Sequence, residues 1–212
     1  MKPPVAHSGN LVWQGSAVSR AQHQLDAGHR GAVVWLTGLP GSGKSTIARG
    51  AQLQLQQLGY RTALLDGDNL RHGLCADLGF SLADRNENVR RTGAVAKLFL
   101  DTGVLVLVAL VSPLQAARAA VRQSVPAGDF LEVHCQCPVT VCRARDPKGH
   151  YAQAERGSIA DFTGVSSPYE APLQPDLCLA TGLEPVQASV AQLLALIQAR
   201  NPLVRGKILP QM

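Results

Sequence analysis

The chain has 212 residues, of which 46% are apolar, and its composition shows no break that would indicate two domains. Its 20 Lys and Arg residues outnumber its 15 Asp and Glu residues, which gives a formal net charge of +5 and suits anionic partners. Only 4% of the residues are aromatic and none are interleaved with a dense basic run, which argues against nucleic acid and favours small anionic molecules.

Five cysteines without a signal-peptide pattern indicate reduced thiols and a cytoplasmic protein. Zinc is the less favoured alternative for His134, Cys135, Cys137 and Cys142, because no C-x-x-C spacing is present and neighbours on a strand point to opposite faces. The apolar run 104–111 is too short to span a bilayer, so we expect a soluble protein with no membrane partner.

The N-terminal segment, residues 1–30, reads as a loose tail followed by a short helix over residues 19–27. Trp13 is a candidate docking residue within it. The first buried strand follows at residues 33–36, where β-branched and large apolar side chains form a continuous run.

A glycine-rich loop, GLPGSGKST, joins this strand to a helix that runs to about residue 58. The pattern G-x-x-x-x-G-K-S between a strand and a helix is typical of a phosphate-binding loop. Its glycines let several backbone N–H groups converge on one phosphate chain, and the helix N-terminus adds partial positive charge. Lys44 can reach the β- and γ-phosphates of a nucleoside triphosphate, and Ser45 can ligate Mg²⁺. The expected nucleotide-binding residues are Gly38, Gly41, Ser42, Gly43, Lys44, Ser45 and Thr46.

Two carboxylates follow the second strand, which is expected over residues 62–66. Ligands of an open parallel sheet lie beyond the carboxyl ends of its strands, so Asp66 and Asp68 should face the same crevice as the phosphate loop. The alternative is that both are turn residues.

Polar and charged residues are dense between residues 70 and 91, and a solvated helical face is the simplest interpretation. Arg71 and Arg85 are candidates for binding an anionic ligand, because a guanidinium can bind phosphate or sulfate bidentately. Phe80 lies in a loop-like stretch, where it could plug the core or stack on a base.

The remaining chain continues the alternation of helices and strands. Residues 145–169 have no clear periodicity and carry three glycines, which predicts a mobile lid. Helical spacing is expected over residues 95–100, 138–143 and 186–200, and strands over residues 104–111, 130–134 and 176–181. The pattern predicts a three-layer α/β/α domain over residues 31–200, with a mainly parallel five-stranded sheet and a C-terminal tail over residues 201–212.

These features favour a small-molecule kinase among proteins with a phosphate-binding loop. The chain lacks an N-K-x-D guanine signature and the second domain or repeat that a motor would need. A closing lid serves a kinase, because it keeps water away from the γ-phosphate.

The chain resembles the adenylylsulfate kinase family from about residue 10 to residue 181. The segment LDGDNLRHGLCADLGFSLADRNENVRR, residues 65–91, is the most specific part of the likeness. Further matches are NLVW, GHRG, WLTGL, AKLF, RDPKG, FTG and PYE. The resemblance implies transfer of the ATP γ-phosphate, with Mg²⁺, to the 3′-hydroxyl of adenosine 5′-phosphosulfate.

The resemblance also implies roles for individual residues. Phe80 and Phe162 would stack on the adenine of the acceptor, while Arg71 and Arg85 take its phosphosulfate. Asp66 or Asp68 would orient the 3′-hydroxyl or hold a Mg²⁺-bound water, and Ser112 matches a position where parts of the family carry a phosphoserine. Arg145 would help to bind ATP. The implied acceptor-binding set is Asp68, Asn69, Arg71, Phe80, Arg85, Asn88, Val111, Ser112, Lys148 and Phe162.

The lid departs from the family pattern. Relatives typically read GLYKKARAGE where this chain reads GHYAQAERGS, residues 149–158, so basic residues are lost and Glu155 appears. We expect a raised KM more than altered chemistry. Two alternatives stay open, a kinase for another small acceptor and a catalytically silent nucleotide-binding subunit of a sulfurylase complex. The resemblance further suggests a homodimer.

Overall fold

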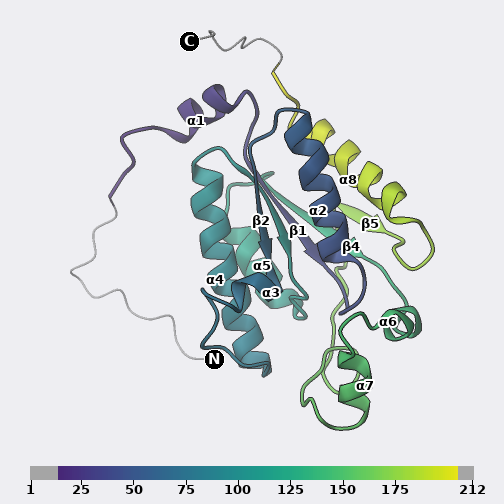
Figure 1. Ribbon diagram of the computed structural model, residues 1–212. Helices are drawn as coiled ribbons and strands as arrows, with labels where there is room; N and C mark the ends of the chain where they lie inside the picture. Colours follow the sequence, from purple (N-terminus) through teal and green to yellow (C-terminus); the bar gives the residue numbers. More distant parts are fainter. Residues whose placement is uncertain (1–13, 205–212) are drawn as a thin grey trace.

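The computed structural model describes residues 14–204 and is built on a five-stranded sheet (Figure 1). All neighbouring strands are parallel, in the order β2-β3-β1-β4-β5. Every residue of β1 and β3 is buried, as expected for apolar strands covered on both faces. The strands are β1 (Ala32–Thr37), β2 (Thr62–Asp66), β3 (Leu105–Ala109), β4 (Phe130–Cys135) and β5 (Leu177–Leu179).

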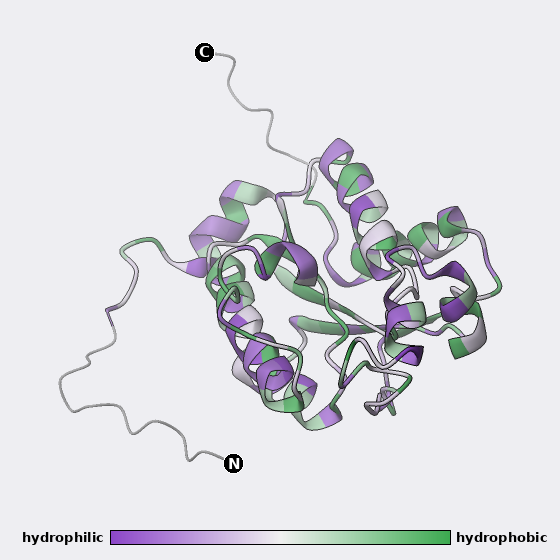
Figure 2. Ribbon diagram, turned by 60° about the horizontal axis from the view of Figure 1, so that its bottom comes forward, coloured by the Kyte–Doolittle hydropathy of each residue, from purple (hydrophilic) through white to green (hydrophobic). Residues whose placement is uncertain are grey.

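Helices cover both faces of the sheet, which confirms the predicted three-layer α/β/α architecture. On one face, α2 (Lys44–Gln57) and α8 (Val186–Arg200) lie side by side and share an apolar core with the strands. On the other face, α4 (Leu82–Asp101) and α5 (Gln115–Ser124) enclose a second core. Figure 2 shows mainly hydrophobic strands between helices of mixed hydropathy.

Within residues 14–204, four shorter helices connect these layers. The predicted N-terminal helix is present as α1 (Arg20–Ala27), and the Ser19 hydroxyl caps it by accepting from the Gln22 N–H. The others lie near the carboxyl ends of the strands, and they are α3 (Gly67–Leu70), α6 (Val139–Arg145) and α7 (His150–Glu155).

The long helix α4 begins 13 residues before the helical spacing that the sequence shows from residue 95. Its first half is hard to recognise because its buried face carries polar residues, among them Asn88 and Thr92. Gly93 lets α5 approach closely, since a Cβ there would lie 2.7 Å from Val121 Cγ2. Arg85 and Asn88 therefore project from a helix, which gives both side chains a fixed base.

The predicted lid, residues 145–169, is more ordered than its sequence suggests. It contains α7, and its side chains join a small apolar cluster with the end of β4 and with α6. Tyr151 is 1% exposed and Phe162 is 6% exposed, so part of the expected lid packs against the rest of the domain. The cluster consists of Cys137, Cys142, Tyr151, Ala154 and Phe162.

Two expectations concern residues beyond the described range. The candidate docking residue Trp13 and most of the C-terminal tail lie outside residues 14–204. Within that range, no helix combines the length and apolar character needed to cross a bilayer.

Candidate active site

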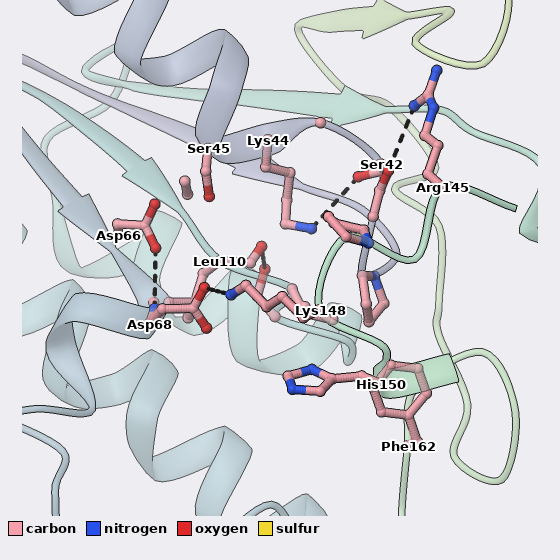
Figure 3. A pocket seen from close by; sticks show the side chains of 18 of the residues that line it. Ser42, Lys44, Ser45, Asp66, Asp68, Leu110, Arg145, Lys148, His150 and Phe162 are labelled. Carbon is pink, nitrogen blue, oxygen red and sulfur yellow. Dashed lines mark hydrogen bonds and ion pairs between the residues drawn. The ribbon is translucent and has the colours of Figure 1, made fainter. Parts of the chain in front are cut away.

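One cavity of about 1110 Å³ opens at the carboxyl ends of the strands, between the phosphate loop and the 145–169 segment. It brings together most of the residues expected from the sequence (Figure 3). These are Gly41, Ser42, Gly43, Lys44, Ser45, Thr46, Asp66, Asp68, Arg71, Phe80, Arg85, Asn88, Val111, Ser112, Arg145, Lys148 and Phe162. Gly38 and Asn69 do not line it.

The phosphate loop holds the Lys44 ammonium by its own backbone carbonyls. Nζ donates to the Gly38 carbonyl at 3.0 Å and to the Leu39 carbonyl at 2.8 Å. Burial lowers the pKa of the ammonium from its ordinary value. Gly41 (φ +76°) and Gly43 (φ +93°) adopt backbone conformations that favour glycine. The loop therefore presents backbone donors and one amine to the same space.

Gly38 has a structural task beside the loop. A Cβ at this position would lie 2.7 Å from both the Cys135 carbonyl oxygen and the Ser42 Oγ. Only a glycine fits there without displacing backbone, so its contribution to the site is the tight exit from β1 and the carbonyl that Lys44 contacts.

The acidic corner after β2 faces this loop across the cavity. The Asp66 side chain is 2% exposed, and its Oδ1 accepts from the Asp68 N–H at 3.1 Å. Its Oδ2 lies 3.5 Å from Nη2 of Arg49, which projects from α2. Asp68 forms an ion pair with Lys148, so the corner also contacts the 145–169 segment. The prediction that the carboxylates and the phosphate loop share a crevice is confirmed.

Phe80 lies between the two predicted arginines. The Arg71 Cζ is 4.2 Å and the Arg85 Cζ 5.5 Å from the ring centroid, within the range of cation–π attraction. Phe80 is 52% exposed, so it does not plug the core.

Both guanidiniums form their hydrogen bonds with backbone carbonyls. Arg71 donates to the carbonyls of residues 78 and 79, and Arg85 donates to those of Phe80 and Asp161. Carbonyls fix the side chains without neutralising them, which leaves two positive charges at one end of the cavity.

Ser112 is held firmly at the end of β3. Its φ is +40°, its Oγ accepts from the Trp35 Nε1–H at 3.0 Å, and it is 2% exposed. Arg118 fixes the backbone by donating to the Ser112 carbonyl at 2.7 Å. The hydroxyl is therefore a buried acceptor for the indole.

The other end of the cavity lies beside α8. Arg145 donates through Nη2 to the Thr181 carbonyl at 2.7 Å, and Thr181, Glu184, Val186 and Ser189 line the wall there. None of these four residues was expected from the sequence. Ligands of a parallel sheet lie beyond the carboxyl ends of its strands, so Thr181, which follows β5, could have been expected at this edge.

Arg49 and His150 are among the other lining residues that the sequence did not indicate. Arg49 lies one turn beyond Ser45 on α2 and reads as an ordinary exposed helix residue, although it pairs with Asp66. His150 opens α7 and lines the cavity opposite the phosphate loop. The sequence does mark His150 in one respect, because the family pattern has a leucine at this position of the segment GHYAQAERGS.

The donors at the loop suit a magnesium ion. Ser45 contributes a hydroxyl and Asp66 a carboxylate, both oxygen ligands of the kind that Mg²⁺ prefers, and both line the cavity beside Lys44. The Asp66 Oδ2 has the exposed Arg49 as its ion-pair partner, at the long distance of 3.5 Å, which leaves lone pairs for a metal-bound water.

A parallel sheet between helix layers, a glycine-rich phosphate loop and carboxylates across one cavity define the class of P-loop kinases. The family model for adenylylsulphate kinase matches residues 30–180. The chain belongs to this family.

Individual relatives support the assignment. The adenylyl-sulfate kinase of Shewanella amazonensis is 52% identical over 185 residues, which cover 87% of this chain and 93% of the relative. That of Vibrio cholerae is 51% identical, covering 92% and 91% of the two chains. The solved APS kinase CysC of Mycobacterium tuberculosis, in complex with AMPPNP and APS, is 48% identical with a TM-score of 0.75, over 80% of this chain and 98% of that one.

Proposed function

We propose that this chain transfers the γ-phosphate of ATP to the 3′-hydroxyl of adenosine 5′-phosphosulfate, giving ADP and 3′-phosphoadenylyl sulfate for sulfate assimilation. The observation that carries the proposal is the shared cavity. Lys44, Asp66 and the Arg71–Arg85 pair line one continuous space between the sheet edge and the 145–169 segment.

The cavity divides naturally into a donor half and an acceptor half. Residues 41–46 would hold the ATP phosphates, with Arg145 and the start of α8 beside the adenine. The opposite half would hold adenylylsulfate, with its adenine near Phe80 and Phe162 and its phosphosulfate near Arg71 and Arg85. The similar M. tuberculosis structure, which holds AMPPNP together with APS, supports this division.

Phosphoryl transfer depends mainly on positioning and on stabilising charge. Lys44 would leave its carbonyl partners for the β- and γ-phosphates. Mg²⁺, held by Ser45 and through water by Asp66, would neutralise charge on the phosphate oxygens. Asp68 would orient the 3′-hydroxyl and take its proton after Lys148 shifts from the carboxylate to the acceptor.

Residues 145–169 would act as a lid in this reaction. Lys148 already contacts the acidic corner, and the Tyr151 hydroxyl donates to the Pro40 carbonyl at 3.0 Å, so the segment touches both halves of the site. Closure over the two nucleotides would exclude water from the γ-phosphate.

Direct transfer without a phosphoserine is part of the proposal. Ser112 is buried, and within residues 14–204 the hydrogen bonds of its Oγ are with the Trp35 indole and the Leu110 carbonyl rather than with a titratable side chain. A hydroxyl without a base is a weak nucleophile.

We further propose a cytoplasmic homodimer. All five cysteines are free, which suits a reducing compartment. A dimer is the expectation from family resemblance. A structure of 30% identity is named as a hexameric APS kinase from Thiobacillus denitrificans, and this chain covers 31% of it, so the size of the assembly needs a direct measurement of mass in solution.

An acceptor panel tests the function. The protein is incubated with ATP, Mg²⁺ and adenylylsulfate, a nucleoside monophosphate or a sugar acid, and ADP release is measured. Of the three acceptors, we expect only adenylylsulfate to cause ADP release. NMR of the product should show a phosphate at the 3′-position. Release with another acceptor would assign a different kinase, and nucleotide binding without any release would indicate the silent subunit.

A further inference from the structure

His150 lies in the acceptor half of the cavity, where the proposed function gives it no task. It is the first residue of α7 and is half-buried. Its ring meets Phe162 edge-on, with centroids 6.2 Å apart and planes at 79°. Figure 3 shows the imidazole pointing toward the side of the cavity where Lys148 and Asp68 meet.

The imidazole has unused hydrogen-bonding capacity. Within residues 14–204, neither ring nitrogen of His150 has a hydrogen-bond partner, whereas the imidazole of His29 bonds through both of its nitrogens. A polar ring that borders a cavity without a hydrogen-bond partner can donate to a ligand or accept from it without breaking a protein hydrogen bond. The charge of Asp146 also acts on this ring.

The charged groups around His150 are nearly all engaged. Asp146 caps α7 by accepting from the N–H groups of Tyr151 and Ala152, both at 3.1 Å. Lys148 pairs with Asp68 from α3. Glu155, on the same helix as His150, pairs with Arg143 from α6 at 2.7 Å.

The wall opposite adds positive charge. Arg85 from α4 donates to the Asp161 carbonyl, and it lines the same cavity as Arg71 and His150. Asp161 also lines the cavity. The positive charge of the two arginines favours an anionic ligand in this half.

We propose that His150 is an acceptor-binding residue whose imidazole hydrogen-bonds adenylylsulfate beside Phe162. The inference rests on the proposed function. Loss of one hydrogen bond between a protein and its ligand lowers affinity by about two- to tenfold.

The test compares wild type with His150→Leu and His150→Gln. Leucine is the residue of the family pattern and keeps the packing against Phe162, while glutamine keeps a hydrogen-bonding group. The matched control is His72→Leu, since His72 is exposed and outside the cavity lining. KM and kcat for adenylylsulfate and KM for ATP are measured, and thermal unfolding confirms that each variant folds.

For His150→Leu, we expect KM for adenylylsulfate to rise about two- to tenfold, with kcat and the KM for ATP close to wild type. His150→Gln should recover part of this loss, and the control should match wild type. A KM for adenylylsulfate in His150→Leu equal to that of wild type would overturn the inference, even with kinase activity intact. Absence of adenylylsulfate phosphorylation by wild type would instead overturn the proposed function.

Discussion

Lys44 is the residue on which the donor half of the site depends most. Lys44 is 8% exposed, and its ammonium donates to two backbone carbonyls that the ATP phosphates would replace. Lys44→Ala should lower kcat by about 10²–10³-fold, because it removes a cation aimed at charge that develops in the transition state. Steady-state kinetics with thermal unfolding as the folding control measures this. A loss below about tenfold would show that the cation lies away from the transferred phosphate.

Ser112 separates two mechanisms at the residue scale. Direct transfer predicts that Ser112→Ala keeps kcat within about threefold of wild type. The same change should cost about 1–3 kcal/mol of stability, since it leaves the buried Trp35 N–H without its acceptor. Kinetics and urea denaturation separate the two effects. A fall in kcat of about 10²-fold or more in the folded variant would favour a phosphoserine intermediate.

Glu155 should oppose nucleotide binding less than its sequence position suggests, because it has an ion-pair partner in the structure. The sequence suggested that its charge would oppose nucleotide binding, but the carboxylate pairs with Arg143 at 2.7 Å, so much of that charge is neutralised. The lost lysines remain the main difference from the family pattern. The double change Ala152→Lys and Gln153→Lys should lower KM for ATP or adenylylsulfate about two- to fivefold at low salt, and less at high salt. Unchanged KM values for both substrates would contradict this expectation.

At the element scale, Arg91 links the first half of α4 to the preceding loop, and Glu87 of the same helix holds Arg91. Hydrogen bonds from Arg90 and also from Arg91 lower the pKa of Glu87 from 4.5 to about 2. Arg91 in turn donates to Asp77 and to the Leu74 carbonyl, which restrains the segment that leads to Phe80.

A depressed carboxyl pKa stabilises the fold above pH 4.5, and this contribution is lost as pH falls toward 2. Glu87→Gln should therefore reduce stability by at most about 1 kcal/mol at neutral pH, because its side chain is 33% exposed and solvent screens the pairs. Denaturant unfolding of both proteins measures the difference. It should shrink toward zero near pH 2, and a difference that is constant with pH would exclude the ion pairs as its cause.

The elements differ in how readily their sequence predicts them. β1 and β3 are continuous apolar runs, so their position at the centre of the sheet follows from composition. The first half of α4 buries Asn88 and Thr92 rather than a clear apolar stripe, and periodicity alone misses it. The helix α7 has six residues and is stabilised by Tyr151 packing against Phe162, a contact between positions that local sequence does not link.

At the scale of the whole molecule, one topological rule placed much of the site. Parallel strands end at one edge, which brings the phosphate loop after β1 and the carboxylates after β2 to the same cavity. The rule says nothing about which residues of α8 or α7 fold over that edge. Val186 and Ser189 could be found only from coordinates, because the packing of distant segments decides their place.

The central claim is that this one cavity holds both nucleotides with the acceptor ribose facing the donor phosphates. A crystal structure with ADP and adenylylsulfate tests it most directly. We predict ADP phosphates on residues 41–46, and an adenylylsulfate 3′-oxygen within hydrogen-bond reach of Asp68 and in line with the terminal phosphate. Adenylylsulfate bound outside the cavity, or with its 3′-oxygen turned away from ADP, would contradict the account.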